Sequence, residues 1–462
     1  MAERFLYGYK KTRTRLSVAV VFPNSYRLGM SNLGFQTVYH MVQSHQDISC
    51  ERVFYEGAGR VPVSVENGRQ LSEFDIVIFS VSFETDLIHC FSMLMMSGIE
   101  LNPSHRKKPY IAAGGIVSVF GAKYIREFAD ILACGDAPLF IPAILENGLN
   151  AKSKDEFLSG LTGIDGMYLH PDIPLGNMPY VRDTEWRFPA HTVILSDETE
   201  FADRGLIEIS RSCLYRCAFC LVSRVYGEYG YLPKERILET AEKYKGLTAR
   251  LGLVAATSTN HPQFGEIVDE LNSGGFSLSF SAFRIEPLDN ELLKKVIDNE
   301  NKTLVIAPET VSPRLKKLIH KDIPESIILE RVRAASLYGI KRIKLYFLIG
   351  LPGETYDDLD EIVRLVTAIR GESSVNVKQS GFLPEMIVDI NPLVPKPFTD
   401  FSESPIEDEK PLRKKTIYLK NRLRSLGRVF VYGESPKNSH LQYRISRGLM
   451  DTAEMIRLAG NE

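Results

Sequence analysis

Three cysteines are clustered within eight residues of the sequence, at Cys213, Cys217 and Cys220. Their C-x3-C-x2-C spacing offers three thiolates, soft ligands that select iron–sulfur clusters or zinc. A structural zinc site needs a fourth ligand, and the nearest histidines in the sequence are His191 and His261. The other cysteines are scattered upstream and do not suggest a disulfide framework. The spacing favours a 4Fe–4S cluster with one iron left free, with an incomplete zinc site or chance as the alternatives.

The composition is that of an ordinary globular chain, with 462 residues of which 44% are hydrophobic and 25% are charged. This length suggests two or three domains. The net charge of −2 gives no global electrostatic case for binding nucleic acid or a membrane surface. No apolar run reaches the roughly 18 residues of a membrane span, and residues 1–15 lack the apolar segment of a signal peptide. Cysteines clustered in this way fit a reducing compartment, so we expect a cytoplasmic protein.

The first 150 residues alternate between apolar runs and helical patterns. The predicted strands are 16–22, 52–55, 75–81, 110–113 and 130–134. Strand–helix alternation with short connections predicts a doubly wound, Rossmann-like parallel sheet with helices on both faces.

Ligands of such sheets bind beyond the carboxyl ends of the strands. Glycines there let a backbone approach a bulky ligand, although a plain turn is the alternative explanation. The candidate positions in these loops are Gly29, Gly34, Ser80, Gly114, Gly115 and Gly135.

Two further segments flank the remaining part of the chain. Residues 151–203 are rich in proline and polar turns, which predicts an irregular linker. Residues 401–462 predict a small C-terminal α+β extension that is largely helical, with a short strand at 429–432 and a basic helix over 406–426. That basic helix could meet a nucleic acid or an acidic partner, but we interpret it as a solvated face beside the acidic residues 403–409.

Strand and helix patterns alternate again over residues 204–400. The predicted strands are 205–210, 251–256, 276–283, 303–307, 342–349 and 385–390. The cysteines follow the first of them, at the end of a β/α barrel strand where chemistry collects. Six strands with connecting helices predict a partial (β/α)6 barrel rather than a closed eight-fold barrel.

Four motifs, in this order, resemble the radical S-adenosylmethionine (SAM) superfamily. They are the cysteine trio with Phe219 before its last member, Ala-Pro-Glu at 307–309, Lys-Leu-Tyr-Phe-Leu-Ile-Gly-Leu-Pro-Gly-Glu-Thr at 344–355, and Asn-Pro-Leu-Val-Pro-Lys-Pro-Phe-Thr at 391–399. Together with residues 22–34 they are similar to a group, of unassigned reaction, that has an N-terminal cobalamin-binding-like domain.

The resemblance implies roles for individual residues. The three cysteines would ligate three irons, and the fourth iron would chelate the amino and carboxylate groups of SAM. Glu309 would bond the SAM ribose, unless it is a buried or capping carboxylate. Arg284 would pair with the SAM carboxylate, unless it forms a salt bridge within the barrel. Phe219, Ile349 and Gly350 would lie near the cofactor, the last two beside the adenine.

Two features depart from the family pattern. The Gly-Gly-Glu that usually grips the SAM amino group is replaced by Ala256-Thr257-Ser258-Thr259, and we expect Thr257 and Ser258 to accept that bond as a variant. The Asp-x-His-x-x-Gly signature that offers cobalt a histidine is absent, but cobalamin-binding members of the family commonly lack it. Whether this chain binds cobalamin is therefore left open.

The predicted function is reductive cleavage of SAM at a 4Fe–4S cluster, with cobalamin-dependent methylation of an unactivated carbon as the reaction if cobalamin is bound. One alternative is a radical SAM enzyme without cobalamin, whose N-terminal domain recruits the substrate. Another is a non-catalytic metal-binding protein. The expected partners are a small-molecule or peptide substrate and a one-electron reductant such as flavodoxin or ferredoxin, with no membrane.

Overall fold

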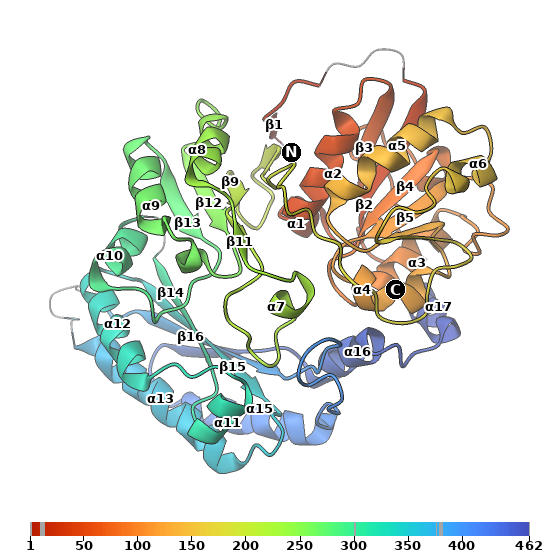
Figure 1. Cartoon of the computed structure of the whole chain (residues 1–462). Coiled ribbons are helices and arrows are strands. Elements are labelled where there is room, and N and C mark those ends of the chain that lie inside the picture. The colour runs from red at the N-terminus through yellow and green to blue at the C-terminus, as the bar shows by residue number, and fades with distance from the viewer. Residues whose placement is uncertain (1, 10–13, 300–301, 376, 378–381, 462) are drawn as a thin grey trace. The chain divides into compact units, whose positions relative to one another are not determined.

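The computed structural model describes residues 2–9, 14–299, 302–375, 377 and 382–461 (Figure 1). It divides into two compact units. The first comprises Met1–Glu208, Lys243–Thr248 and Arg444–Glu462, and the second comprises Ile209–Glu242 and Ala249–Tyr443. Among the described residues, no helix is both long and apolar enough to cross a membrane.

A six-stranded sheet forms the centre of the first unit. Its strands are β2 (Leu16–Phe22), β3 (Ile48–Phe54), β4 (Ile76–Ser80), β5 (Tyr110–Gly114), β6 (Ile131–Ala133) and β7 (Met167–Leu169). They lie in the order β3-β2-β4-β5-β6-β7, parallel up to β6, whereas β7 is antiparallel. The five parallel strands have the 2-1-3-4-5 order of a doubly wound fold, whose crevice opens between β2 and β4. This confirms the predicted parallel sheet.

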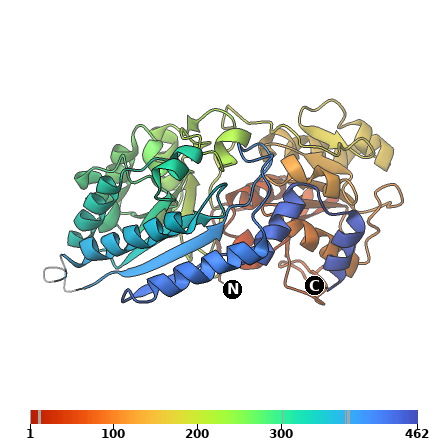
Figure 2. The same cartoon turned by 90° about the horizontal axis from the view of Figure 1, so that it is seen from below.

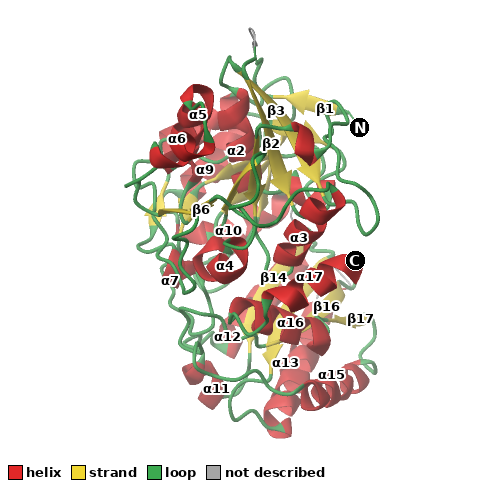
Figure 3. Ribbon diagram, turned by 90° about the vertical axis from the view of Figure 1, so that its right-hand side faces the viewer, coloured by secondary structure: helices red, strands yellow, loops and turns green. Residues whose placement is uncertain are grey.

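Helices cover both faces of this sheet, because its strands are apolar on both sides. The helices of the unit are α1 (Tyr26–Gly29), α2 (Leu33–Gln43), α3 (Asp86–Met96), α4 (Ser118–Ile125), α5 (Ile141–Asn150), α6 (Lys154–Ser159) and α17 (Thr452–Asn461). One core joins alternate strand residues such as Val18 and Val20 to Phe35 of α2 and Ile144 of α5. On the opposite face the C-terminal helix α17 packs beside α3 (Figure 3).

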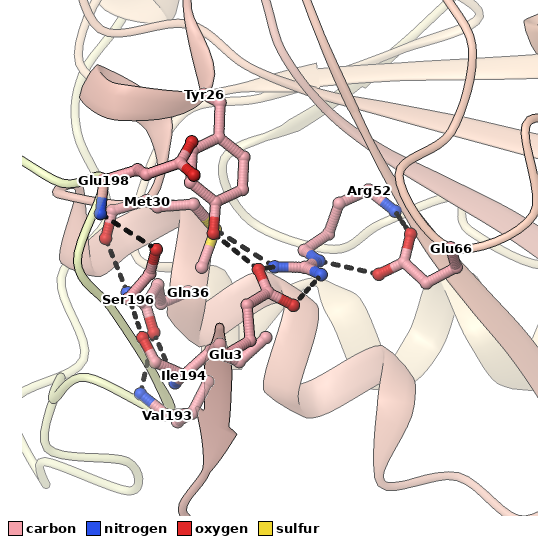
Figure 4. A network of polar contacts seen from close by, with 10 residues as sticks. All are labelled: Glu3, Tyr26, Met30, Gln36, Arg52, Glu66, Val193, Ile194, Ser196 and Glu198. Carbon is pink, nitrogen blue, oxygen red and sulfur yellow. Dashed lines mark hydrogen bonds and ion pairs between the residues drawn. The ribbon is translucent and has the colours of Figure 1, made fainter. Parts of the chain in front are cut away.

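The N-terminal strand β1 (Glu3–Phe5) is tied into the first unit by buried polar contacts (Figure 4). It pairs with β8 (Ile194–Ser196). Arg52, whose side chain is 1% exposed, donates to both carboxylate oxygens of Glu3 at 2.7 and 2.8 Å and to Glu66 at 2.6 Å. Gln36 accepts from the backbone N–H groups of Val193 and Ile194 at 2.7 and 2.9 Å. These contacts satisfy groups that would be costly to bury alone.

The segment predicted as a linker belongs to the first unit. Residues 151–203 contain α6, β7 and β8, and β7 completes the sheet beside β6. A parallel bridge joins Val181 to Gly135. Trp186 is buried. The prolines interrupt regular hydrogen bonding, as expected, but the chain between them still pairs with the edge of the sheet.

The second unit has the strand–helix alternation of a partial β/α barrel (Figure 1). Its strands after residue 249 are β12 (Arg250–Val254), β13 (Ser277–Phe280), β14 (Thr303–Glu309), β15 (Arg342–Ile349), β16 (Glu385–Pro392) and β17 (Val429–Tyr432). Strands β14 to β17 form one parallel sheet, and β12 pairs in parallel with β13. The strand expected at 429–432 therefore extends the barrel sheet rather than belonging to a separate extension.

The barrel helices lie on the outer face of these strands. They are α8 (Lys234–Glu242), α9 (Phe264–Ser273), α10 (Asn290–Asp298), α11 (Pro313–Leu318), α12 (Glu325–Leu337), α13 (Tyr356–Ser374) and α15 (Glu409–Leu423), which lies alongside α13 (Figure 2, blue). Strand β15 alternates strictly, with Ile343, Leu345, Phe347 and Ile349 fully buried. These residues face the covering helices, and the less buried residues between them face the barrel interior.

The predicted C-terminal extension is divided between the units. Helix α15, strand β17 and the start of α16 (Pro436–Ser446) belong to the second unit, whereas residues from Arg444 onward belong to the first. Lys123 of α4 donates to the carbonyls of Gly448 and Met450 at 2.7 and 2.8 Å. The C-terminal segment is therefore fixed to the first unit by specific contacts.

Candidate functional site: a cysteine loop in the second unit

The three cysteines lie on an irregular segment, here called the cysteine loop (residues 212–221), which follows β9 (Gly205–Glu208) and β10 (Ser210–Arg211) and precedes α7 (Val222–Val225). Ile209, which follows β9, donates its backbone N–H to the carbonyl of Val254 at the end of β12, at 2.9 Å. Ser212 turns the chain into the loop with a φ of 63° and donates to the carbonyl of Gly227 at 2.6 Å. Strand β10 pairs with β11 (Gly230–Tyr231). The loop therefore leaves the carboxyl end of a barrel strand.

Distant segments brace the middle of the cysteine loop. The backbone N–H of Ala218 donates to the carbonyl of Ile319, after α11, at 2.9 Å, and its carbonyl accepts from the N–H of Asp400 at 3.0 Å. Arg224, just beyond the loop, forms an ion pair with the Asp400 carboxylate at 2.7 Å. A small apolar cluster surrounds these contacts, with Phe219 packed against it: Ala218, Leu315, Ile319, Leu351, Leu393 and Phe401. The downstream motifs thus meet at the cysteine loop.

The three thiols influence one another electrostatically. Burial raises the pKa of Cys217, and the neighbouring thiols of Cys213 and Cys220 add to that rise. Burial also raises the pKa of Cys220. Two cations, Lys321 and Arg284, oppose the rise at Cys217, so they favour its thiolate form. Protonated thiols and nearby cations suit a site that releases protons when a metal binds.

The thiols are not arranged around a single ion. Within the described ranges, no group of three His, Cys, Asp or Glu side chains is close enough to hold one metal ion. A zinc ion would draw its sulfurs to about 2.3 Å from one centre. A 4Fe–4S cluster makes a different demand, because each thiolate binds its own iron. Three neighbouring thiols on one loop, beside two cations, fit that donor chemistry.

Buried polar atoms without protein partners lie at the segment after β12. The side-chain oxygens of Ser258 and Thr259 and the amide nitrogen of Asn260 have no hydrogen-bond partner in the structure, and Ser258 is 0% exposed. The hydroxyl of Thr257 lies 3.6 Å from the sulfur of Cys213. Buried polar groups are normally hydrogen-bonded, so these three neighbouring groups are available to a ligand or to ordered water. This is the segment in which the sequence predicts Thr257 and Ser258 as SAM contacts.

Glu309 ends β14 in a left-handed backbone conformation, with a φ of 65°. Its carboxylate accepts from Lys321 at 2.9 Å. Burial raises its pKa, and the Lys321 and Arg284 cations only partly oppose that rise. A non-glycine residue at positive φ is costly and persists where the surroundings fix it, often at functional sites. The structure gives Glu309 a buried ion pair, which is the alternative that the sequence left open, and leaves the ribose contact as a prediction.

Arg284 is already paired within the barrel. Its Nε donates to Glu286 at 2.8 Å, and its guanidinium carbon lies 3.9 Å from the centre of the Tyr215 ring in the cysteine loop. The salt bridge that the sequence offered as an alternative is therefore present. The sequence did not single out Glu286, Tyr215 or Lys321 for these contacts. Glu286 is only two residues from Arg284. The fold alone brings Tyr215 to Arg284 and Lys321 to Glu309.

The two predicted adenine contacts, Ile349 and Gly350, lie in different surroundings. Gly350 has a φ of 77°, a conformation that favours glycine. Its N–H donates to the Glu354 carboxylate at 2.8 Å. Ile349 is 0% exposed and shares the helix-covered face of β15 with Phe347. We therefore expect the backbone at 349–350, and not the Ile349 side chain, to face the interior.

At several glycines of the first unit, other atoms of the protein lie so close that a side chain would not fit. A Cβ on Gly115 would lie 2.4 Å from the Val81 carbonyl, and one on Gly135 would lie 2.2 Å from the Val181 carbonyl. A Cβ on Gly29 would meet Phe54 at 2.5 Å. Packing within the unit thus requires these three glycines. At Gly34 and Gly114 the nearest contacts are longer, at 3.1 and 3.3 Å.

Hydrogen-bonded polar side chains join the segments that follow β2 and β4. Asn24 donates to Asp86 at 2.9 Å, and Asn32 donates to the Ser82 hydroxyl at 3.0 Å. Ser80 is buried at the end of β4. His89 lies on α3, with Nδ1 2.8 Å from the carbonyl of Pro23. Hydrogen-bonded polar groups therefore occupy the strand ends at the topological switch point.

Curated relatives share 22–24% identity with this chain. An uncharacterized protein of Methanocaldococcus jannaschii is 24% identical over 422 residues, which cover 89% of this chain and 84% of that protein. A putative methylthiotransferase of the same organism is 24% identical over 62% of this chain and 63% of its own length. The ribosomal protein uS12 methylthiotransferase of Alkalilimnicola ehrlichii is 22% identical, and the match covers 35% of this chain and 41% of that enzyme.

Two solved structures share the fold. The radical SAM methyltransferase TsrM from Kitasatospora setae, bound to tryptophan and a SAM analogue, is 14% identical, with a TM-score of 0.52 over 76% of this chain and 71% of its own. The cobalamin-dependent SAM radical enzyme OxsB, with aqua-cobalamin and SAM bound, is 13% identical, with a TM-score of 0.54 over 92% of this chain and 65% of its own.

Two family models match most of the described architecture. The model for radical SAM proteins, N-terminal, matches residues 34–170. The model for the radical SAM superfamily matches residues 207–366. Together they cover more than half of the chain and include the first sheet from β3 to β7, the cysteine loop and the barrel as far as β15. The chain is therefore an enzyme that belongs to the radical SAM superfamily.

Proposed function

We propose that this enzyme cleaves SAM reductively at a 4Fe–4S cluster bound by Cys213, Cys217 and Cys220. Enzymes of its family use such a cluster and SAM. The observation that carries the assignment is the cysteine loop, whose three neighbouring thiols follow a barrel strand and are braced at Ala218. When bound, the cluster supplies the electron that breaks the S–C5′ bond of SAM.

The residues around the loop would bind and orient SAM. The orphaned hydroxyls of Ser258 and Thr259 and the amide of Asn260 offer hydrogen bonds to its amino and carboxylate groups. Glu309 remains the candidate for the ribose, with Lys321 holding its carboxylate in place. Arg284 would reach the carboxylate of SAM only by sharing its pairing with Glu286. Phe219 and the backbone at Gly350 would exclude water from the cofactor.

A cobalamin-dependent methyl transfer to carbon is the first candidate for the reaction. The 2-1-3-4-5 sheet supports it, because this fold offers a crevice between β2 and β4. The fold likeness to TsrM and OxsB, a methyltransferase and a cobalamin-dependent enzyme by their descriptions, adds to that support.

A radical reaction without cobalamin is the second candidate. The packing of Gly115 against Val81 and of Gly135 against Val181 supports it, because protein backbone already makes the close approaches that the sequence assigned to a bulky ligand at these two glycines. In that case the first unit would recruit the substrate, a small molecule or a peptide. Either reaction needs a one-electron donor such as flavodoxin or ferredoxin.

The test is anaerobic reconstitution with iron and sulfide, with cobalamin supplied, followed by metal, corrin and SAM-product analysis. We expect about four irons per chain, a reduced-cluster EPR signal and SAM-dependent 5′-deoxyadenosine. S-adenosylhomocysteine together with bound corrin would support methyl transfer, and 5′-deoxyadenosine alone would support the second candidate.

The cysteine variants provide the control for that test. Changing Cys213, Cys217 and Cys220 together to Ala should abolish the iron signal and lower SAM cleavage at least 100-fold. The matched change of Cys50, Cys90 and Cys134 to Ser should leave both intact. Cleavage retained without the cysteine trio would contradict the proposal.

A further inference from the structure

One lysine of the basic helix α15 is buried in a mostly exposed run of cations. The side chain of Lys415 is 7% exposed, and its Nζ lies 2.9 Å from Glu354 and 2.9 Å from Glu407. Its neighbours Arg413 and Lys414 are exposed. A buried ammonium loses its hydration, so a buried lysine needs paired carboxylates to remain charged.

Lys415 connects α15 to the turn that ends β15. The Oε2 atom of Glu354 that accepts from Lys415 also accepts from the backbone N–H of Gly350, at 2.8 Å. The Glu354 side chain is 1% exposed, and burial raises its pKa while the Lys415 ammonium favours its charged form. One carboxylate oxygen thus links the helix to the turn.

Apolar packing fixes the same turn against α15. Gly350 has a φ of 77°, and a Cβ on it would lie 2.7 Å from Cδ2 of Leu412 and 3.1 Å from the Glu407 carboxylate. Leu412 and Lys415 are one helical turn apart, so they contact the turn from the same face of α15. The backbone that the family resemblance places beside the adenine of SAM therefore rests directly on this helix.

We propose that Lys415 is a positioning residue for SAM, which holds the Gly350 turn in its binding conformation through Glu354. The proposal rests on the function proposed above and assigns a role to the C-terminal helix. Lys415 itself does not touch the reacting atoms. Its loss should weaken the binding of SAM far more than the chemistry at saturating SAM, because the cluster and the orphaned hydroxyls after β12 are unchanged.

The test compares Lys415→Met with Lys415→Arg and with the exposed control Lys414→Met. The measurements are iron content and the SAM dependence of 5′-deoxyadenosine formation in the reconstituted holoenzyme. Lys415→Met should raise KM for SAM at least 10-fold, with kcat within about 3-fold and iron content unchanged. Lys415→Arg should recover most of the loss, and Lys414→Met should match the wild type.

A double variant separates positioning from folding, because Lys415→Met leaves the Glu354 carboxylate buried and unpaired. Glu354→Gln with Lys415→Met removes that charge, and the glutamine oxygen can still accept from Gly350. We expect the double variant to regain the thermal stability of the wild type while KM for SAM stays raised.

The outcomes distinguish this inference from the proposed function. A wild-type KM in Lys415→Met, or in the double variant, overturns the role of Lys415 and leaves the proposed function intact. A wild-type enzyme that is fully loaded with iron and does not cleave SAM overturns both.

Discussion

At the scale of single residues, buried charged side chains near the cysteine loop favour the thiolate form of its cysteines. Lys321 pairs with Glu309 at 2.9 Å and also favours the thiolate form of Cys217. Arg284 has a similar double role, since it pairs with Glu286 and lies over Tyr215 of the loop. A bound cluster with three thiolates carries negative charge, and these two cations would offset it without a bulk counterion.

A buried histidine of the first unit makes stability depend on pH. His191 is 2% exposed, with Nδ1 2.7 Å from the carbonyl of Pro189 and Nε2 2.7 Å from the hydroxyl of Tyr7. Burial lowers its pKa to about 4 from 6.5. The unfolded chain binds this proton more readily, so folding stability is lost as pH falls from about 6.5 towards 4.

The measurement is the free energy of unfolding of the first unit's transition in urea at pH 7.5 and pH 5. We expect His191 to account for about 2 kcal/mol of the loss between these pH values. His191→Gln should lower stability at pH 7.5 and remove that part of the pH dependence. An unchanged pH dependence in the variant would show that His191 does not titrate abnormally.

At the scale of secondary-structure elements, the cysteine loop is held by segments from different parts of the barrel sequence. The end of α11 accepts from Ala218, and the segment after β16 donates to it. The loop has almost no regular structure of its own, so its shape depends on these neighbours. The motif at 391–399 therefore has a clear structural purpose, because it leads directly into Asp400 and Phe401.

The ion pair between Arg224 and Asp400 should control how firmly the loop retains its cluster. Asp400→Asn removes the charge but keeps the backbone bond to Ala218. We expect global stability to fall by less than about 1 kcal/mol, because the Asp400 side chain is 37% exposed. Iron release to a chelator should become at least 3-fold faster than in the wild type. The exposed Glu403→Gln is the matched control, and equal release rates in all three proteins would refute the role of the ion pair in cluster retention.

At the scale of the whole molecule, the two compact units are not continuous stretches of the sequence. The C-terminal segment, from Arg444, belongs to the same compact unit as the N-terminal sheet. Lys123 holds that segment through the carbonyls of Gly448 and Met450. Met450 and Met455 are buried, at 1% and 0% exposure.

Removing buried volume from α17 should therefore destabilise the N-terminal unit. Met455→Ala is expected to cost about 2–4 kcal/mol, because a fully buried methionine leaves a cavity. Thermal unfolding followed by limited proteolysis would identify which unit is affected. The exposed Leu449→Ala is the control, and cleavage of the barrel unit before the first unit would contradict this assignment.

The sequence alone determined the two α/β architectures and the cysteine trio. Buried parallel strands are apolar throughout and helices are periodic, so both are local signals that need no tertiary context. The residues at the carboxyl ends of strands could be named for the same reason, since parallel strands end at one edge.

Only the tertiary structure decided which partners these residues have. Lys321, Asp400 and Lys415 pair with side chains that lie 12, 176 and 61 residues away, and a side-chain pairing over such a distance leaves no local pattern. The same reason explains the segment 151–203, whose prolines resemble a linker although its backbone pairs with the sheet. It also explains the basic helix α15, where the run of basic residues predicts a solvated face and the fold buries one lysine against the Gly350 turn.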